Sequence, residues 1–203
     1  MKYLEKIQTL LPLGYLYLIV LGLLKEGVLY YRLGINILNY SSITDILISP
    51  VSDLASEPAL ILAVIVIFSF FFIIQTLIVK NSHTNWAKKI LGQNRFGEDT
   101  SKKEIRKVVL PYFIIFLAFE LLCIFVGLGV GRGGKLSERI SQGSFQCNYK
   151  ITLNNGKSED AYLFDLNSSY GFYLIKGTKN IKIVPVANIG TLELLNDGKT
   201  TKN

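Results

Sequence analysis

The chain has 203 residues, of which 50 % are hydrophobic and 18 % are charged, and its formal net charge is +7. A soluble domain carries about 25 % charged residues, and its helices normally show one polar face. The apolar residues here lie in long runs instead, which argues against an ordinary soluble protein and favours helices surrounded by lipid. The positive charge is then expected to face lipid headgroups and to set the membrane topology, so we predict no nucleic-acid partner.

The first apolar run covers residues 7–24 and follows Lys2 and Lys6. A basic start before a short apolar run also describes a secretory signal peptide. No small-x-small cleavage site follows the run, which continues into "KEGVLYYRLG". We therefore predict an uncleaved membrane span here, with Tyr15 and Tyr17 near its middle.

An amphipathic segment connects the first run to the second. Apolar residues recur at helical spacing from Ile43 to Leu54, and Ser42 with Asp45 forms a start that resembles a capping box. The 17 residues from 33 to 49 are too few and too polar to span a bilayer comfortably. We expect a helix lying in the membrane interface, or a re-entrant segment, which Pro50 should bend or end.

Two further runs are long enough to cross a bilayer, which takes about 20 apolar residues. Residues 59–79 contain no charge, and residues 108–130 contain only Glu120. Near the end of this third run, Gly127 and Gly131 fit a small-xxx-small helix-packing pattern. The sequence therefore predicts three membrane spans.

The loop at residues 80–107 is strongly basic. The positive-inside rule places this loop and the N-terminus in the cytoplasm, and therefore places the C-terminal region outside it. A cytoplasmic protein could dock on the same cations. The candidate residues of this loop are Lys88, Lys89, Arg95, Lys102, Lys103, Arg106 and Lys107.

Glu120 lies 13 residues after Lys107, roughly 18–20 Å along a helix and so near the bilayer centre. A carboxylate there costs about 2.5–3.5 kcal/mol, so Glu120 must face protein or water. Ser69, in the middle of the second run, and Tyr15 and Tyr17 in the first are expected at the same depth. Glu120 could hold helices together as a neutral acid, line a conduction path in an oligomer, or act as a proton-linked switch.

From residue 144 the apolar period changes to two, which is typical of strands. Five short antiparallel strands are expected within residues 144–196, with Asn155-Gly156 as the first hairpin turn. Five strands in so short a segment predict a small all-β barrel of SH3-like or Sm-like type. We place a linker at residues 132–143 before the barrel and a flexible tail at residues 197–203 after it.

The predicted architecture is therefore a membrane-helical domain over residues 1–131 followed by the β-barrel. Aromatic side chains of the barrel are candidates for a binding surface, although alternate ones in so small a barrel also build the core. They are Tyr162, Phe164, Tyr170, Phe172 and Tyr173.

The sequence contains few motifs that indicate catalysis, metal binding or cofactor binding. Gly129, Gly131 and Gly134 formally match G-x-G-x-x-G, but no preceding strand or βαβ unit supports a dinucleotide site. No His/Cys group has metal-ligand spacing, and no nucleophile has an adjacent base. We therefore predict no catalytic residue, no metal, no cofactor and no enzyme activity.

The order of elements, with "IKIVPVANIGTLEL" as the last strands, resembles small bacterial membrane proteins that join a few spans to a compact β-barrel. Some of these are anti-phage sensors or effectors, and the small mechanosensitive channels also join spans to an Sm-like domain. The bulky third run departs from the glycine- and alanine-rich pore helix of those channels, and three spans depart from the two of the effectors. No functional residue is carried over.

These observations favour a non-enzymatic, self-associating membrane protein of a bacterial inner membrane. Its β-module would sense or bind a partner, and its spans would transmit or execute a response, in phage defence as the resemblance implies. One alternative is a homo-oligomeric ion channel lined by Glu120. Another is a membrane anchor for a cytoplasmic protein that docks on residues 80–107. Membrane lipids are expected partners in each case.

Overall fold

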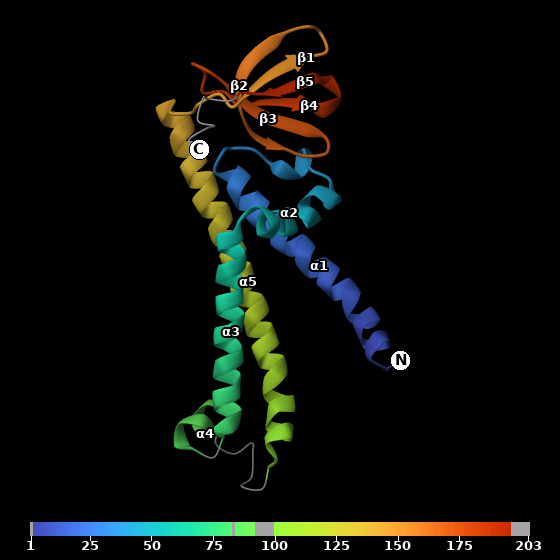
Figure 1. The fold of residues 1–203 in the computed structure, drawn as a ribbon, viewed down its shortest axis with the longest axis vertical. Helices are drawn as coiled ribbons and strands as arrows, with labels where there is room; N and C mark the ends of the chain where they lie inside the picture. The colour runs from blue at the N-terminus through green and yellow to red at the C-terminus, as the bar shows by residue number, and fades with distance from the viewer. Residues whose placement is uncertain (1, 83, 92–99, 196–203) are drawn as a thin grey trace, which may run out of the picture. The chain divides into compact units, whose positions relative to one another are not determined.

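The computed structural model describes residues 2–82, 84–91 and 100–195, and Figure 1 shows their helices and strands in chain order. The α-helices in this part of the chain are α1 (Lys2–Tyr31), α2 (Ile43–Ser56), α3 (Pro58–Lys80), α4 (Asn85–Leu91) and α5 (Lys102–Gln142). The strands are β1 (Tyr149–Leu153), β2 (Ser158–Leu166), β3 (Tyr170–Ile175), β4 (Lys182–Pro185) and β5 (Ile189–Leu194). Short 3-10 helices cover Ile37–Asn39 and Val186–Asn188.

The chain forms two compact units. One is built from the described parts of residues 1–50 and 125–203, and the other from residues 51–124. The first membrane-type helix therefore belongs to the same unit as the C-terminal sheet. α3, α4 and the first half of α5 belong to the second unit.

Three helices, α1, α3 and α5, are long and apolar enough to cross a membrane, which confirms the three predicted runs. The apolar stretches are Leu10–Tyr31, Pro58–Lys80 and a part of Lys102–Gln142, and most of their side chains are exposed. Exposed apolar helices of this length are suited to lipid surroundings. Length and composition thus make the chain compatible with a membrane protein.

α5 is longer than the predicted third span, and the expected linker at residues 132–143 is helical as far as Gln142. The helix ends at Gly143, whose φ of +66° places it in the left-handed region. The Gly143 N–H donates to Ile140 O at 3.2 Å and the Ser144 N–H to Arg139 O at 3.0 Å, which is a Schellman motif. This stop signal, and not the earlier glycines, ends the helix.

α1 and α5 cross closely at two glycines of α5. A Cβ atom on Gly129 would lie 2.4 Å from Lys25 O, and one on Gly133 would lie 2.7 Å from Leu29 O. The packing pair is therefore Gly129 and Gly133. Our prediction of Gly127 and Gly131 was wrong, since a Cβ atom added to either would meet nothing within 4 Å among the described residues. Residue numbers rise together along both helices, so α1 and α5 run in the same direction, as first and third spans must.

α2 begins as predicted. Ser42 Oγ accepts the Asp45 N–H at 3.1 Å, and Asp45 Oδ2 accepts the Ser42 N–H at 3.0 Å, which closes the capping box. Pro50 lies inside the helix and does not end it. Because proline has no N–H, it cannot donate to the carbonyl of Ile46 four residues earlier. That carbonyl lies against Gly22 of α1, where a Cβ atom would be 2.0 Å away.

The C-terminal sheet has the strand order β4-β3-β2-β1-β5, and all its pairings are antiparallel. Gly156 has a φ of +84°, which confirms the Asn155-Gly156 turn. The sheet is not closed, because β4 and β5 are its two edges. The predicted barrel is thus seen as an open five-stranded sheet, and its SH3-like or Sm-like type stays a prediction.

Each face of the sheet carries a buried cluster. One face packs around Ile151, Ala161 and Tyr173. The other carries Phe172, which is buried together with Tyr30 of α1. The end of α1 therefore packs on the Phe172 face of the sheet.

Candidate functional site

The most polar buried place in the first unit is a junction between α1, α2 and β2. Its first part is an ion pair near the end of α1, where Lys25 Nζ lies 2.8 Å from Glu26 Oε1. Lys25 is 3 % exposed and also donates to Ser49 Oγ of α2 at 2.7 Å, while Ser49 donates to Glu26. A charge buried in an apolar helix has to be paired in this way.

The second part of the junction joins α1 to the sheet. The Tyr30 hydroxyl donates to Asp165 Oδ2, and Tyr30 is only 1 % exposed. The β2–β3 register shifts between Leu163 and Asp165, so that Asp165 pairs with Phe172. This bulge turns Asp165 to the face that meets α1, a use of β-bulges seen at many functional sites.

The charges of the Lys25–Glu26 ion pair also affect the pKa of Asp165. Burial raises the pKa of its carboxyl above the ordinary value of 3.8, and the negative charge of Glu26 raises it further. The hydrogen bond from Tyr30 and the charge of Lys25 act in the opposite direction without cancelling the rise. Lys25, Glu26, Tyr30 and Asp165 are thus one electrostatically coupled group.

Sequence reasoning missed this junction. We ended the first run at Leu24, so Lys25 and Glu26 fell in the connection to the second run. The signal was the directly adjacent pair of opposite charges, followed by Tyr30 one helical turn later. Nothing in the sequence showed that Asp165 would meet them, because that contact depends on the bulge.

Aromatic rings surround the junction and include most of the predicted binding-surface residues. The Tyr30 and Phe172 ring centroids lie 5.1 Å apart, and those of Phe172 and Phe164 lie 6.2 Å apart. Tyr170 meets Tyr40 edge-on at 5.3 Å. These contacts are packing within the unit, as is the burial of Tyr173 on the opposite face. The ring centroid of half-buried Tyr162 lies 5.9 Å from that of Phe145. The role of the predicted aromatic side chains as a partner-binding surface stays a prediction.

A second link attaches the β2–β3 turn to the start of α2. Asp45 Oδ2 accepts the Ser168 hydroxyl at 2.8 Å, and Asn167 Nδ2 donates to Tyr40 O at 3.0 Å. Partial burial raises the pKa of Asp45, but hydrogen bonds from Ser42 and Ser168 outweigh it and leave that pKa below its ordinary value. The turn is therefore held by an ionised carboxylate that also caps a helix.

We expect Asp45→Ala to lower the free energy of unfolding by about 1–2 kcal/mol, because it removes the helix cap and the link together. Ser168→Ala removes only the link and should lower it by about 0.5–1 kcal/mol. Thermal unfolding of the purified chain in detergent measures both. Equal effects of the two substitutions would show that the cap contributes nothing beyond the link.

The predicted intramembrane partners are distributed between the two units. Glu120 is partly buried in α5 and Ser69 is exposed in α3, both in the second unit. No hydrogen bond joins these two side chains within the described residues. Tyr15 and Tyr17 lie in α1 of the first unit. The three roles proposed for Glu120 stay predictions.

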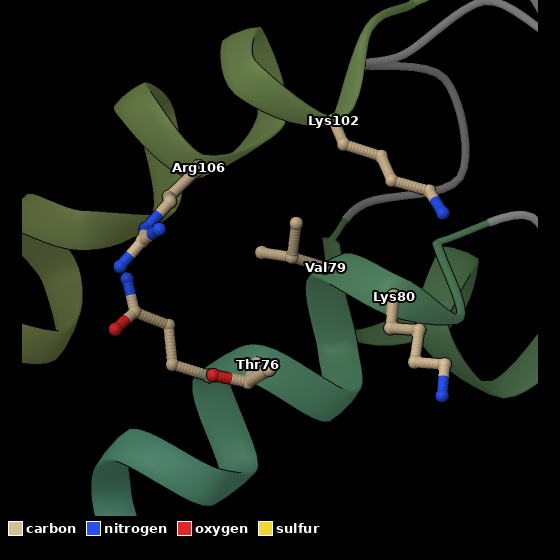
Figure 2. A pocket seen from close by; sticks show the side chains of 6 residues that line it. Thr76, Val79, Lys80, Lys102 and Arg106 are labelled. Atoms are coloured by element: carbon tan, nitrogen blue, oxygen red, sulfur yellow. The ribbon is translucent and has the colours of Figure 1, made fainter.

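The second unit contains a basic pocket of about 240 Å³ at the end of α3 and the start of α5. Figure 2 shows Lys80, Lys102 and Arg106 around it, together with Thr76 and Val79. The sixth lining residue is Gln75. The described lining therefore contains three cations and no acid.

Of the predicted loop cations that the structure describes, Lys102 and Arg106 line this pocket. Lys88 and Lys89 lie in the last turn of α4, and Lys103 and Lys107 lie on α5 outside the lining. Arg95 and the predicted tail at 197–203 lie outside the described residues. Lys80, the first cation of the same loop, completes the basic lining.

Comparisons with protein-family models, with curated proteins and with solved structures find no match to this chain. The class of the protein therefore follows from its own structure, which has three helices suited to a membrane and an open antiparallel sheet packed on one of them.

Proposed function

We propose that the chain is a non-enzymatic integral membrane protein in which the β-module binds or senses a partner and α1 carries the response into the membrane. The observation that supports this is the position of Tyr30. It lies in the last turn of an apolar helix and is also a buried part of the cluster on the Phe172 face of the sheet.

The sheet is attached to the helices in a way that favours transmission of a movement of the sheet to α1. A flexible connection between them would not transmit it. The Tyr30–Asp165 and Asp45–Ser168 hydrogen bonds connect the sheet to both α1 and α2. Moving the sheet relative to α1 would leave the buried Tyr30 hydroxyl and the partly buried Asp165 carboxyl without each other, which costs about 1–3 kcal/mol for each group. A ligand that favours one sheet position would thereby shift α1 between discrete arrangements.

The same proposal assigns the chain to a bacterial inner membrane, with the N-terminus and residues 80–107 in the cytoplasm and the sheet outside it. The parallel crossing of α1 and α5 supports an odd number of crossings before the sheet. The strand order, in which β5 returns beside β1, supports an SH3-like module. Self-association, and a role in phage defence, rest on the resemblance described above.

Hydrogen exchange of the full chain in lipid nanodiscs tests the transmission. We expect Asp165→Asn to change amide exchange in the last three turns of α1, since it alters the buried junction. Asp160→Asn, an exposed change on the same strand, is the matched control and should leave α1 as it is. Identical α1 exchange in both variants would contradict the proposal.

The topology has its own test in intact cells. Cys147 lies just before β1, so a membrane-impermeant maleimide should label it in a Cys123→Ser background if the sheet is outside. Labelling only after permeabilisation would reverse the orientation.

A further inference from the structure

The basic pocket of the second unit has the composition of an anion site. Lys80, Lys102 and Arg106 line it from two helices, and none of its described lining residues is an acid. The Thr76 hydroxyl donates to Phe72 O at 2.8 Å, so its proton is already used. The groups available to an anion are therefore the three cations and the Gln75 amide.

Gln75 gives the second, independent observation. Its side chain lines the pocket, the residue is only 6 % exposed, and its Nε2 atom has no hydrogen-bond acceptor among the described residues. A buried donor without an acceptor is disfavoured by about 1–3 kcal/mol and calls for a partner. An anion oxygen in the pocket would supply that partner.

The residues that line the pocket lie where a lipid headgroup would be if α3 and α5 crossed a bilayer. Lys80 is the last residue of α3, and Gln75 lies five residues earlier, about 7.5 Å along the helix. On α5, Arg106 precedes the apolar run that begins at Val108. Both helices thus pass from polar to apolar sequence beside the pocket, which is where lipid phosphates lie in a bilayer.

From this geometry we propose that the pocket binds the phosphate group of an anionic phospholipid. The guanidinium of Arg106 can hold two phosphate oxygens at once, and the lysines add charge. Val79 gives the pocket an apolar side, which suits the glycerol end of a lipid better than a fully hydrated ion. A volume of about 240 Å³ fits a compact headgroup and lies below the roughly 300–1,000 Å³ of drug-sized ligand sites.

Native mass spectrometry of the full chain in detergent, titrated with phosphatidylglycerol or phosphatidylcholine, tests the proposal. Phosphatidylglycerol should bind more tightly, because the choline cation is repelled by the pocket. Lys102→Gln and Arg106→Gln should each weaken phosphatidylglycerol binding about fivefold. Lys103→Gln, which removes the same charge from the next position of α5 but outside the lining, should change binding less than twofold.

Two further variants separate a positioned site from general positive charge. Arg106→Lys keeps the charge but loses the two-oxygen contact, so it should still weaken binding. Gln75→Leu should weaken binding while leaving the lipid-free chain as stable as before or more stable, because it removes an unpaired buried amide. A merely structural Gln75 would lose stability and keep its lipid affinity, which would overturn the proposal.

Two other results would also overturn it. An equal loss in Lys103→Gln would show that lipid binding follows overall charge and not this pocket. Inorganic phosphate that competes with phosphatidylglycerol at comparable concentration, with the same dependence on Arg106, would assign the pocket to a soluble phosphate in place of a lipid.

Discussion

Gly22→Ala should lower the free energy of unfolding by about 1–3 kcal/mol, although alanine is a better helix former than glycine. The added Cβ atom would lie 2.0 Å from the Ile46 carbonyl oxygen, so α1 and α2 must separate. Gly27→Ala, on the same helix with nothing within 4 Å of the new atom, is the matched control. It should be neutral or raise stability by up to about 1 kcal/mol.

The test depends on the opposite signs of the two stability changes, because Gly22→Ala and Gly27→Ala make the same chemical change in one helix. Thermal unfolding in detergent and in nanodiscs measures them. A second pair repeats the test at the α1–α5 crossing, where Gly129→Ala should destabilise and Gly127→Ala should not. If Gly22→Ala and Gly27→Ala had the same effect, the close approach of α1 to α2 would be contradicted.

The close crossing at Gly22 also accounts for Pro50. The proline leaves the Ile46 carbonyl without its helical donor, and the glycine of α1 lets a backbone approach that carbonyl. A proline in one helix and a glycine in another thus form one packing feature. Sequence periodicity could not reveal this, since it describes each helix alone.

Single-helix and single-hairpin features could be predicted well. The three apolar runs, the Ser42–Asp45 cap and the Asn155-Gly156 turn depend on neighbouring residues, and the structure has all of them. The end of α5 was missed although its signal, Gly143, is also local. Five glycines of α5 precede Gly143, and our boundary at residue 131 falls among them, although two of them serve helix packing.

The junction and the pocket could not be predicted because each depends on residues far apart in sequence. Asp165 reaches Tyr30 across 135 positions, and only after a bulge has turned it. Lys80 and Arg106 were both visible as cations, but their convergence with Gln75 needs two helices in register. Charge patterns predicted a membrane side for the loop and no site within it.

Tyr30→Phe should lower the free energy of unfolding by about 1.5–3 kcal/mol, because it removes a hydrogen bond to a buried carboxyl group. Asp165→Asn should cost less, since its amide oxygen can still accept the Tyr30 hydroxyl. In a double-mutant cycle the two effects should not add, because the residues are in direct contact. Additive effects would contradict the contact.

The effect of Tyr30→Phe should also depend on pH. Burial raises the pKa of Asp165 in the folded chain, so the folded state holds its proton to higher pH than the unfolded state does. Stability from this group is therefore present in acid and is lost as the pH rises from the ordinary value of 3.8 through the raised one. The Tyr30 hydrogen bond limits this loss by stabilising the carboxylate, so Tyr30→Phe should be most harmful at neutral pH and less harmful in acid. Asp165→Asn cannot ionise at this position and should remove this part of the pH dependence. If the penalty of Tyr30→Phe were the same at both ends of that range, the hydroxyl would not be bound to an ionising carboxyl group, and the link between α1 and the sheet would rest on aromatic packing alone.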